Sequence, residues 1–100
     1  MPTYATLFTH TDHGKQNIET IPTEVFPLAQ ELTEEIGGEV QALYYGNMGE
    51  YDGISIATLP DGEAAEQFRL ALEREGTHRL EQYEVFEAED YFEMIEEATR

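Results

Sequence analysis

The sequence contains no cysteine, a single lysine and no long hydrophobic run. The absence of cysteine excludes a disulfide framework, a Cys-ligated zinc site, an iron–sulfur cluster and a thiol nucleophile. No apolar stretch approaches the ~20 residues that a membrane-spanning helix needs. The first residues also lack the basic segment of a secretory signal. We therefore expect a cytoplasmic protein that makes no use of a membrane.

The charge of the chain is almost all of one sign. Twenty-two Asp and Glu residues stand against five Lys and Arg residues, which gives a net charge of −17. Such a charge repels phosphate backbones, so nucleic-acid binding through a basic patch is excluded. Repulsion among these charges also destabilises the folded state at low ionic strength. At ~1 M salt the Debye length is only about 3 Å, so most of that repulsion is screened. The composition favours a halophilic protein over an ordinary acidic one, with most carboxylates serving solvation.

Several catalytic signatures are missing. The sequence has no Gly-x-Gly-x-x-Gly, no P-loop, no Gly-x-Ser-x-Gly and no His-Glu-x-x-His, and Ser55, its only serine, lies in the middle of a predicted strand. These absences disfavour a serine hydrolase, a kinase, a Walker-type NTPase and a classical Rossmann enzyme.

Alternating polarity predicts strands. Residues 3–10 alternate, with Tyr4, Thr6, Phe8 and His10 on one face. Residues 40–45 and 51–59 are expected to form a hairpin around a turn at 46–49, and 78–86 is predicted as a fourth strand.

Helical spacing of apolar residues predicts three main helices. The first follows Thr23 as N-cap and ends before Gly37, the second follows Asp61 as N-cap and ends before Gly76, and the third covers 89–98. A short helical piece is expected after the turn that begins at Thr11.

The order of elements is β-α-β-β-α-β with a terminal helix, in one domain over residues 1–100. This order predicts an α+β, ferredoxin-like fold with a four-stranded antiparallel sheet. Two helices cover one sheet face only, and the first three strands are apolar on both faces. We therefore expect a second copy of the chain to cover the other face, as a homodimer that forms a dimeric α/β barrel.

The middle of the chain reads Gly49-Glu50-Tyr51-Asp52-Gly53, followed by Leu59-Pro60-Asp61. With the opening Pro2-Thr3-Tyr4 and with Gly37-Gly38, this pattern resembles the GYD family of short proteins, named for a Gly-Tyr-Asp motif. Here Glu50 interrupts the triplet, which maps onto Gly49, Tyr51 and Asp52. The resemblance implies a relative of the dimeric α/β-barrel, ferredoxin-like domains, and it implies no reaction.

Tyr51 and Asp52 have two interpretations. In the first, Gly49 makes the turn, Tyr51 packs and Asp52 caps a backbone N–H. In the second, Tyr51 and Asp52 frame one end of a ligand pocket between the sheet and the helices. His10 shares a strand face with Tyr4 and would serve as an acid or base beside such a pocket.

Other residues offer weaker signals. Six tyrosines offer a lining for a cavity that binds an aromatic or lipophilic ligand, although aromatic residues on strands usually belong to a core or an interface. The segment His10-Thr11-Asp12-His13 resembles a metal-ligand cluster, with His78 as a third imidazole, but a polar turn with exposed histidines accounts for it better. We expect no metal and no cofactor.

Three functions compete. The first is a dimeric module that binds or senses a small molecule, with Tyr51, Asp52, His10 and Tyr4 as ligand-binding residues. The alternative is a cofactor-free enzyme of the oxygenase or isomerase type, in which His10 is the acid or base and Tyr51 and Asp52 orient the substrate. The third is a structural or protein-interaction module without a ligand.

Overall fold

The computed structural model describes all residues 1–100 and contains one antiparallel sheet. Its strands are β1 (Thr3–His10), β2 (Glu39–Met48), β3 (Tyr51–Thr58) and β4 (His78–Val85). They lie in the order β2-β3-β1-β4. The central strand β1 pairs antiparallel with both β3 and β4. The predicted α+β, ferredoxin-like arrangement is confirmed.

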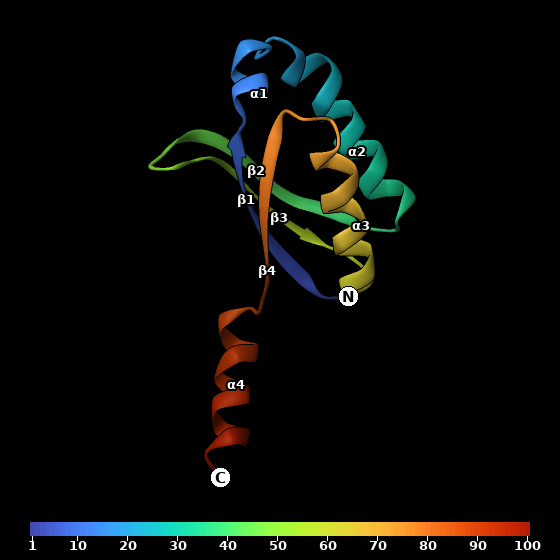
Figure 1. The fold of residues 1–100 in the computed structure, drawn as a ribbon. Helices are drawn as coiled ribbons and strands as arrows, with labels where there is room; N and C mark the ends of the chain where they lie inside the picture. The colour runs from blue at the N-terminus through green and yellow to red at the C-terminus, as the bar shows by residue number, and fades with distance from the viewer.

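Five helical segments connect or extend the strands. They are α1 (Asp12–Gln16), a π-helical turn η1 (Ile21–Val25), α2 (Phe26–Glu35), α3 (Gly62–Glu73) and α4 (Ala88–Ala98). Helices α2 and α3 lie together on one face of the sheet, whereas α4 projects away from the rest of the molecule (Figure 1).

The entry into α2 differs from the prediction. Thr23 is not its N-cap, because the Thr23 hydroxyl donates to the carbonyl oxygen of Glu19 at 3.3 Å within the helical segment that precedes α2. The helix instead continues directly from η1, and Pro27 falls in its first turn, where a missing N–H is tolerated. For α3 the predicted N-cap is confirmed, since Asp61 Oδ1 accepts from the backbone N of Ala64 at 2.8 Å.

The hairpin turn also lies later than predicted. Strand β2 continues through Gly46 to Met48, which pairs with Tyr51, so Gly49 and Glu50 alone make the turn. Gly49 has a φ of +73°, as a tight turn requires. A register irregularity between Tyr45 and Met48 accommodates the residues that were expected in the turn.

The buried core is small and divided. No side chain is fully buried, and two separate clusters lie between the sheet and the helices. One cluster consists of Tyr4, Leu59, Ala64 and Ala65, and the other consists of Val25, Leu72 and Leu80. The space between sheet and helices is therefore not filled evenly.

The sheet face opposite the helices is apolar and uncovered in the single chain. Its central pairs join Leu7 to Ile54 and Ala5 to Ile56, residues that alternate with the buried side of β1. Tyr44 on the same face is 68% exposed. The expectation of an apolar second face is thus met, while the dimer that would cover it stays a prediction.

None of the helices has the length and apolar character that crossing a membrane would demand.

Candidate functional site

A cavity of about 410 Å³ lies between the sheet and helix α2. Nine of its thirteen lining residues are hydrophobic, so its walls favour an apolar occupant. The lining includes Phe8, Phe26, Leu43, Tyr45, Phe68 and Leu72. His78 is its one ionisable side chain apart from the Tyr45 phenol.

Small residues keep this space open. Gly53 pairs with Phe8 across the β1–β3 ladder, and a side chain at Gly53 would collide with the Phe8 ring. Ser55 on β3 and Ala29 on α2 also border the cavity with short side chains. Phe8 therefore lies over bare backbone, and the volume beside it remains unfilled.

A second hollow of about 420 Å³ adjoins the first. It is bordered by His10 and by residues near η1, among them Ile21 and Pro22. The two cavities share Phe26, Leu43 and Tyr45 as lining residues. His78 and His10 therefore border two adjoining cavities.

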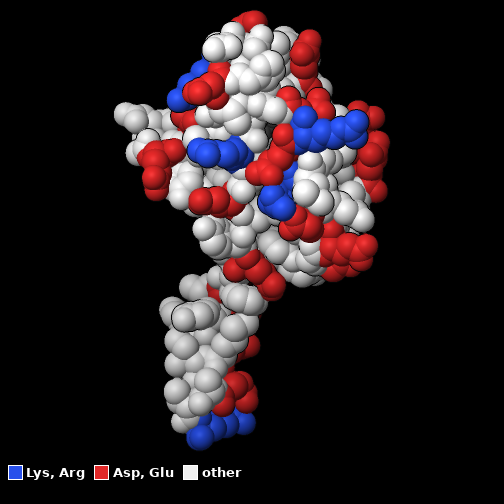
Figure 2. All heavy atoms as spheres, in the orientation of Figure 1, with Lys and Arg blue, Asp and Glu red and all other residues white.

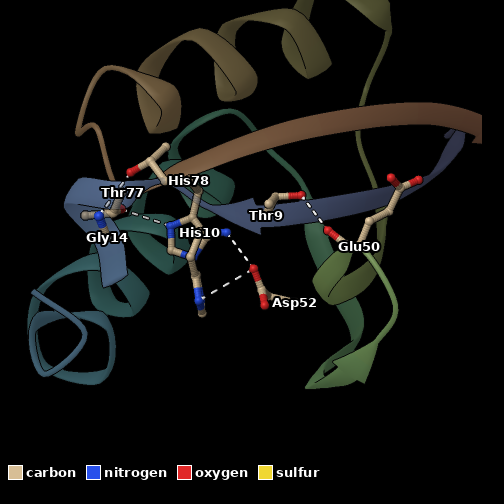
Figure 3. Close-up of polar contacts among 8 residues, drawn as sticks. Thr9, His10, Gly14, Glu50, Asp52, Thr77 and His78 are labelled. Carbon is tan, nitrogen blue, oxygen red and sulfur yellow. Dashed lines mark hydrogen bonds and ion pairs between the residues drawn. The ribbon is translucent and has the colours of Figure 1, made fainter. Parts of the chain in front are cut away.

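The two imidazoles come together because of strand pairing. His10 ends β1 and His78 begins β4, and the two residues are direct partners in the β1–β4 ladder. Their ring centroids are 4.9 Å apart, with an angle of 74° between the planes. Figure 3 shows the two rings next to one another and the Asp52 carboxylate turned toward His10.

Asp52 fixes the orientation of His10. Its Oδ2 accepts a hydrogen bond from the backbone N of His10 at 2.8 Å and lies 3.7 Å from His10 Nδ1. A carboxylate on this side of the ring favours the tautomer with the proton on Nδ1. Nε2 of His10 then carries a lone pair and can accept a proton or a hydrogen bond.

His78 is held in the neutral form. It is 3% exposed, and its Nδ1 lies 2.9 Å from the hydroxyl oxygen of Thr77. Burial lowers the pKa of His78 from 6.5 to about 4, with a further lowering by His10 and an opposing effect of Asp52. At neutral pH the ring therefore offers one donor and one acceptor nitrogen.

Both rings have an unused nitrogen. Nε2 of His10 and Nε2 of His78 are buried and lack a hydrogen-bond partner within the protein. Buried polar atoms in native proteins are nearly always paired, so each exception calls for an explanation. A ligand with a polar group would supply the missing partners.

Helix α1 supports this end of the sheet. The backbone N of Thr11 donates to Thr77 O at 3.0 Å, and the Thr11 hydroxyl donates to Gly76 O. Gly14 packs so closely on the backbone of Thr77 that a side chain would not fit. The segment before His78 is thus fixed from one side by α1.

The structure separates the predicted site residues. Asp52 joins His10, whereas the Tyr51 hydroxyl donates to Glu81 Oε2 at 2.6 Å. Glu81 pairs with Leu7, so this contact belongs to the sheet face away from the helices. The hydrogen bond to Glu81 raises the pKa of Tyr51 to about 12. Tyr51 and the His10 region are therefore not parts of one pocket.

Tyr4 lies elsewhere again. It packs in the cluster with Leu59, Ala64 and Ala65 and does not line the cavity of either histidine. His13 is exposed on α1, where its ring contacts the Asn17 amide. No group of three or more potential ligand side chains is placed to hold a metal ion.

Two residues of this region were not among the predicted ligand-binding residues. His78 and Tyr45 border the cavity, and Tyr45 lies within 6.4 Å of the His78 ring centroid and 6.0 Å of the His10 ring centroid. The signal for His78 was its place at the start of the fourth strand. In a ferredoxin-like sheet this strand is antiparallel to the first, so its start meets the end of the first strand.

Comparison with known proteins gives a family and a fold. The solution structure of the C-terminal domain of the MgtC protein from Mycobacterium tuberculosis is similar, with a TM-score of 0.55 and 12% identity over 84% of this chain and 86% of that one. At this identity the likeness shows the fold alone. A REP-associated tyrosine transposase bound to a REP hairpin gives a TM-score of 0.48 and 15% identity over 93% of this chain and 61% of that one.

No curated protein sequence matches the chain. The model of the GYD domain matches residues 4–95, which include the sheet apart from Thr3 and both helices that cover it. The chain therefore belongs to the GYD domain family.

Proposed function

We propose that the chain is a small-molecule binding or sensing module whose ligand is apolar and carries one hydroxyl group. The observation that supports it is the apolar cavity of about 410 Å³ bordered by His78 and adjoining His10. Protein interiors contain few voids larger than a water molecule, and apolar cavities of this kind do not hold water well. The volume lies within the ~300–1,000 Å³ typical of ligand pockets.

The polar atoms of the two histidines indicate that the ligand carries a hydroxyl group. His10 Nε2 is an acceptor in the tautomer that Asp52 favours, so it suits a ligand O–H donor. His78 is neutral at pH 7 and offers no positive charge to an anion. The net charge of −17 on the chain repels anions as well. A neutral phenol or alcohol fits both histidines better than a carboxylate or a phosphate.

Binding can be tested with 2-naphthol, using naphthalene as the probe that lacks the hydroxyl. Fluorescence titration in about 2 M KCl should show 2-naphthol binding roughly tenfold more tightly, the effect of one hydrogen bond. His10→Leu should remove this preference and keep the apolar binding. His13→Leu, at an exposed histidine, is the matched control and should change neither affinity.

A filling variant tests the location. Ala29→Phe places a ring into the cavity and should abolish the binding of both probes. Binding that survives this change, or no binding of either probe to the native chain, would overturn the proposal.

A second candidate function is a cofactor-free enzyme that removes a proton from a small organic substrate. It is favoured by the Asp52–His10 pair, in which a carboxylate orients an imidazole whose other nitrogen is free. The probe is 5-nitrobenzisoxazole, whose isoxazole ring opens to a nitrile and a phenolate when a base removes the proton at C3 and the N–O bond breaks. His10→Gln should abolish any rate above that of buffer, and Asp52→Asn should reduce it, while His13→Gln leaves it unchanged.

Adaptation to high salt is a further part of this proposal. Of the 22 carboxylates, Glu66, Glu73 and Glu97 pair with an arginine. Acidic side chains are spread over the visible surface, with few basic ones between them (Figure 2). Screening by salt would relieve the resulting repulsion.

A further inference from the structure

Helix α4 has an apolar side that the rest of its own chain leaves exposed. None of the residues in Ala88–Ala98 is buried. Four large hydrophobic side chains of the helix are between 42% and 58% exposed: Tyr91, Phe92, Met94 and Ile95. An isolated helix of eleven residues is marginal in water, and an amphipathic one gains its stability by burying its apolar side.

The charged residues of α4 lie mostly on its other side. At 3.6 residues per turn, Asp90, Glu93 and Glu97 fall opposite the apolar side, and Glu89 and Glu96 lie at its edge beside Phe92. Figure 2 shows acidic side chains along one side of this protruding segment, basic atoms at its far end and uncharged atoms over the rest of its visible surface. The helix is thus built for contact on one side only.

A second uncovered apolar surface lies on the sheet. Its residues are those of the face opposite the helices, among them Ala5, Leu7, Ile54, Ile56, Tyr44 and Tyr83. Tyr44 and Tyr83 are 68% and 52% exposed. We call this surface the open sheet face. Because α4 continues beyond the end of β4, away from the sheet, it does not cover the open sheet face of its own chain (Figure 1).

The chain exposes more surface than a compact monomer of its mass would. A compact monomer of 11.4 kDa should expose about 5,800 Å². This chain exposes 6718 Å², an excess of roughly 900 Å² by that scaling. One side of a standard protein–protein interface buries about 800 Å². The radius of gyration of 15.0 Å likewise exceeds the ~13 Å of a compact chain of this length.

We propose that α4 is an exchanged arm, which packs its Tyr91, Phe92 and Ile95 side on the open sheet face of a second copy of the chain. Two copies related by a two-fold axis would exchange arms reciprocally, so each covers the surface that the other leaves bare. A second copy fits because one chain carries both complementary apolar surfaces, and together they account for an excess area of interface size. The acidic side of each arm then remains in solvent.

Light scattering on the full chain in about 2 M KCl tests the assembly, since salt screens the repulsion between two acidic copies. The native chain should have about twice its mass of 11.4 kDa. The double variant Phe92→Ala with Ile95→Ala should weaken the dimer roughly a hundredfold or more. Alanine is the best helix former, so this loss would not come from unfolding of the arm.

The matched control is the double variant Glu93→Ala with Glu97→Ala, on the other side of the same helix. It should remain dimeric. A native chain that is monomeric in high salt, or a control that dissociates as readily as the apolar variant, would overturn the proposal.

Disulfide cross-linking distinguishes arm exchange from other contacts. Because the native chain has no cysteine, each introduced cysteine is the only one in its chain. Protein with Phe92→Cys is mixed with protein with Ala5→Cys and oxidised. A disulfide between the two proteins is expected. If disulfides form only between two Phe92→Cys chains, the arms pair with each other. A third protein carries both Phe92→Cys and Ala5→Cys, and a disulfide within its monomer would mean that the arm folds back on its own sheet. Either result would overturn arm exchange.

Discussion

His10 and His78 meet edge to face, with their ring centroids 4.9 Å apart, although 67 residues separate them in the sequence. They are direct partners at the end of the β1–β4 ladder, so their contact is a property of the sheet and not of a flexible loop. Each keeps a buried Nε2 without a partner.

The pKa of His78 makes stability depend on pH. Because burial lowers this pKa from 6.5 to about 4, the unfolded chain binds more protons between these values. The contribution of His78 is fully present above pH 6.5 and is lost as the pH falls toward 4. The loss should be on the order of 3 kcal/mol.

Urea unfolding of the native chain and of His78→Gln from about pH 7 to pH 4 measures this loss. Protonation of carboxylates affects both proteins, so the difference between them isolates His78. Equal pH profiles, or a His78 resonance that titrates near 6.5 in NMR spectra, would contradict the expectation.

Gly53 should tolerate no side chain. A Cβ there would strike the Phe8 ring and approach the Tyr44 carbonyl oxygen to 2.8 Å. Gly53→Ala should therefore lower the free energy of unfolding by about 1–3 kcal/mol, the cost of overpacking. Gly46→Ala is the control, because nothing lies within 4 Å of a Cβ at that strand position. Similar losses for both variants would show that the Phe8 contact is not the cause.

The N-cap of α3 can be tested separately from its charge. Asp61→Ala removes the acceptor for the backbone N of Ala64 and should destabilise the chain by about 1 kcal/mol. Asp61→Asn keeps a capping oxygen and removes the same negative charge. It should remain within a few tenths of a kcal/mol of the native chain. If both variants lose equally, the charge and not the cap explains the effect.

Tyr51 should ionise later than an ordinary tyrosine. Its hydrogen bond to Glu81 raises the pKa of Tyr51 to about 12 from 10.0, because a phenolate beside a carboxylate is disfavoured. In an ultraviolet titration, Tyr51→Phe should remove a transition near pH 12. Glu81→Gln should move that transition toward pH 10. In the control variant Glu84→Gln, the transition should stay near pH 12.

Salt should stabilise the fold through screening. At a net charge of −17, the thermal midpoint should rise by several degrees between about 0.05 M and 1 M KCl, over which the Debye length falls from more than 10 Å to about 3 Å. Circular dichroism at each salt concentration measures it. A midpoint that stays constant over this range would argue against adaptation to high salt.

The order of the fold was predictable because local signals agree with it. Alternation marks β1 and β3, Asp61 caps α3, and Gly37 and Gly76 both have positive φ just after a helix. The position of the hairpin turn was not predictable, because Gly46 and Asn47 suit a turn and a bulged strand equally. Tertiary packing decides the register of the β2–β3 pair, and in that register Gly46 and Asn47 belong to strand β2.

The candidate site was predictable in part. His10 and Asp52 lie together, but strict alternation did not indicate that Tyr51 would contact Glu81 on the opposite face. The sequence suggested a pocket between the sheet and the helices but not its lining or its volume, which depend on how Phe8 packs over Gly53 and on how far α2 lies from the sheet. A ligand role for Tyr51, Asp52, His10 and Tyr4 stays a prediction.

The divided core has a consequence for the life of the protein in the cell. The core is split into clusters of four and three buried residues, and Val25 and Leu72 of the smaller cluster line the cavity, so a molecule that occupies the cavity would enlarge that cluster. Binding would then act as the last step of folding, because any ligand that binds only the native state stabilises it. Chains made without that molecule would open more often and meet proteases first, so the amount of this protein would follow the supply of the molecule it binds.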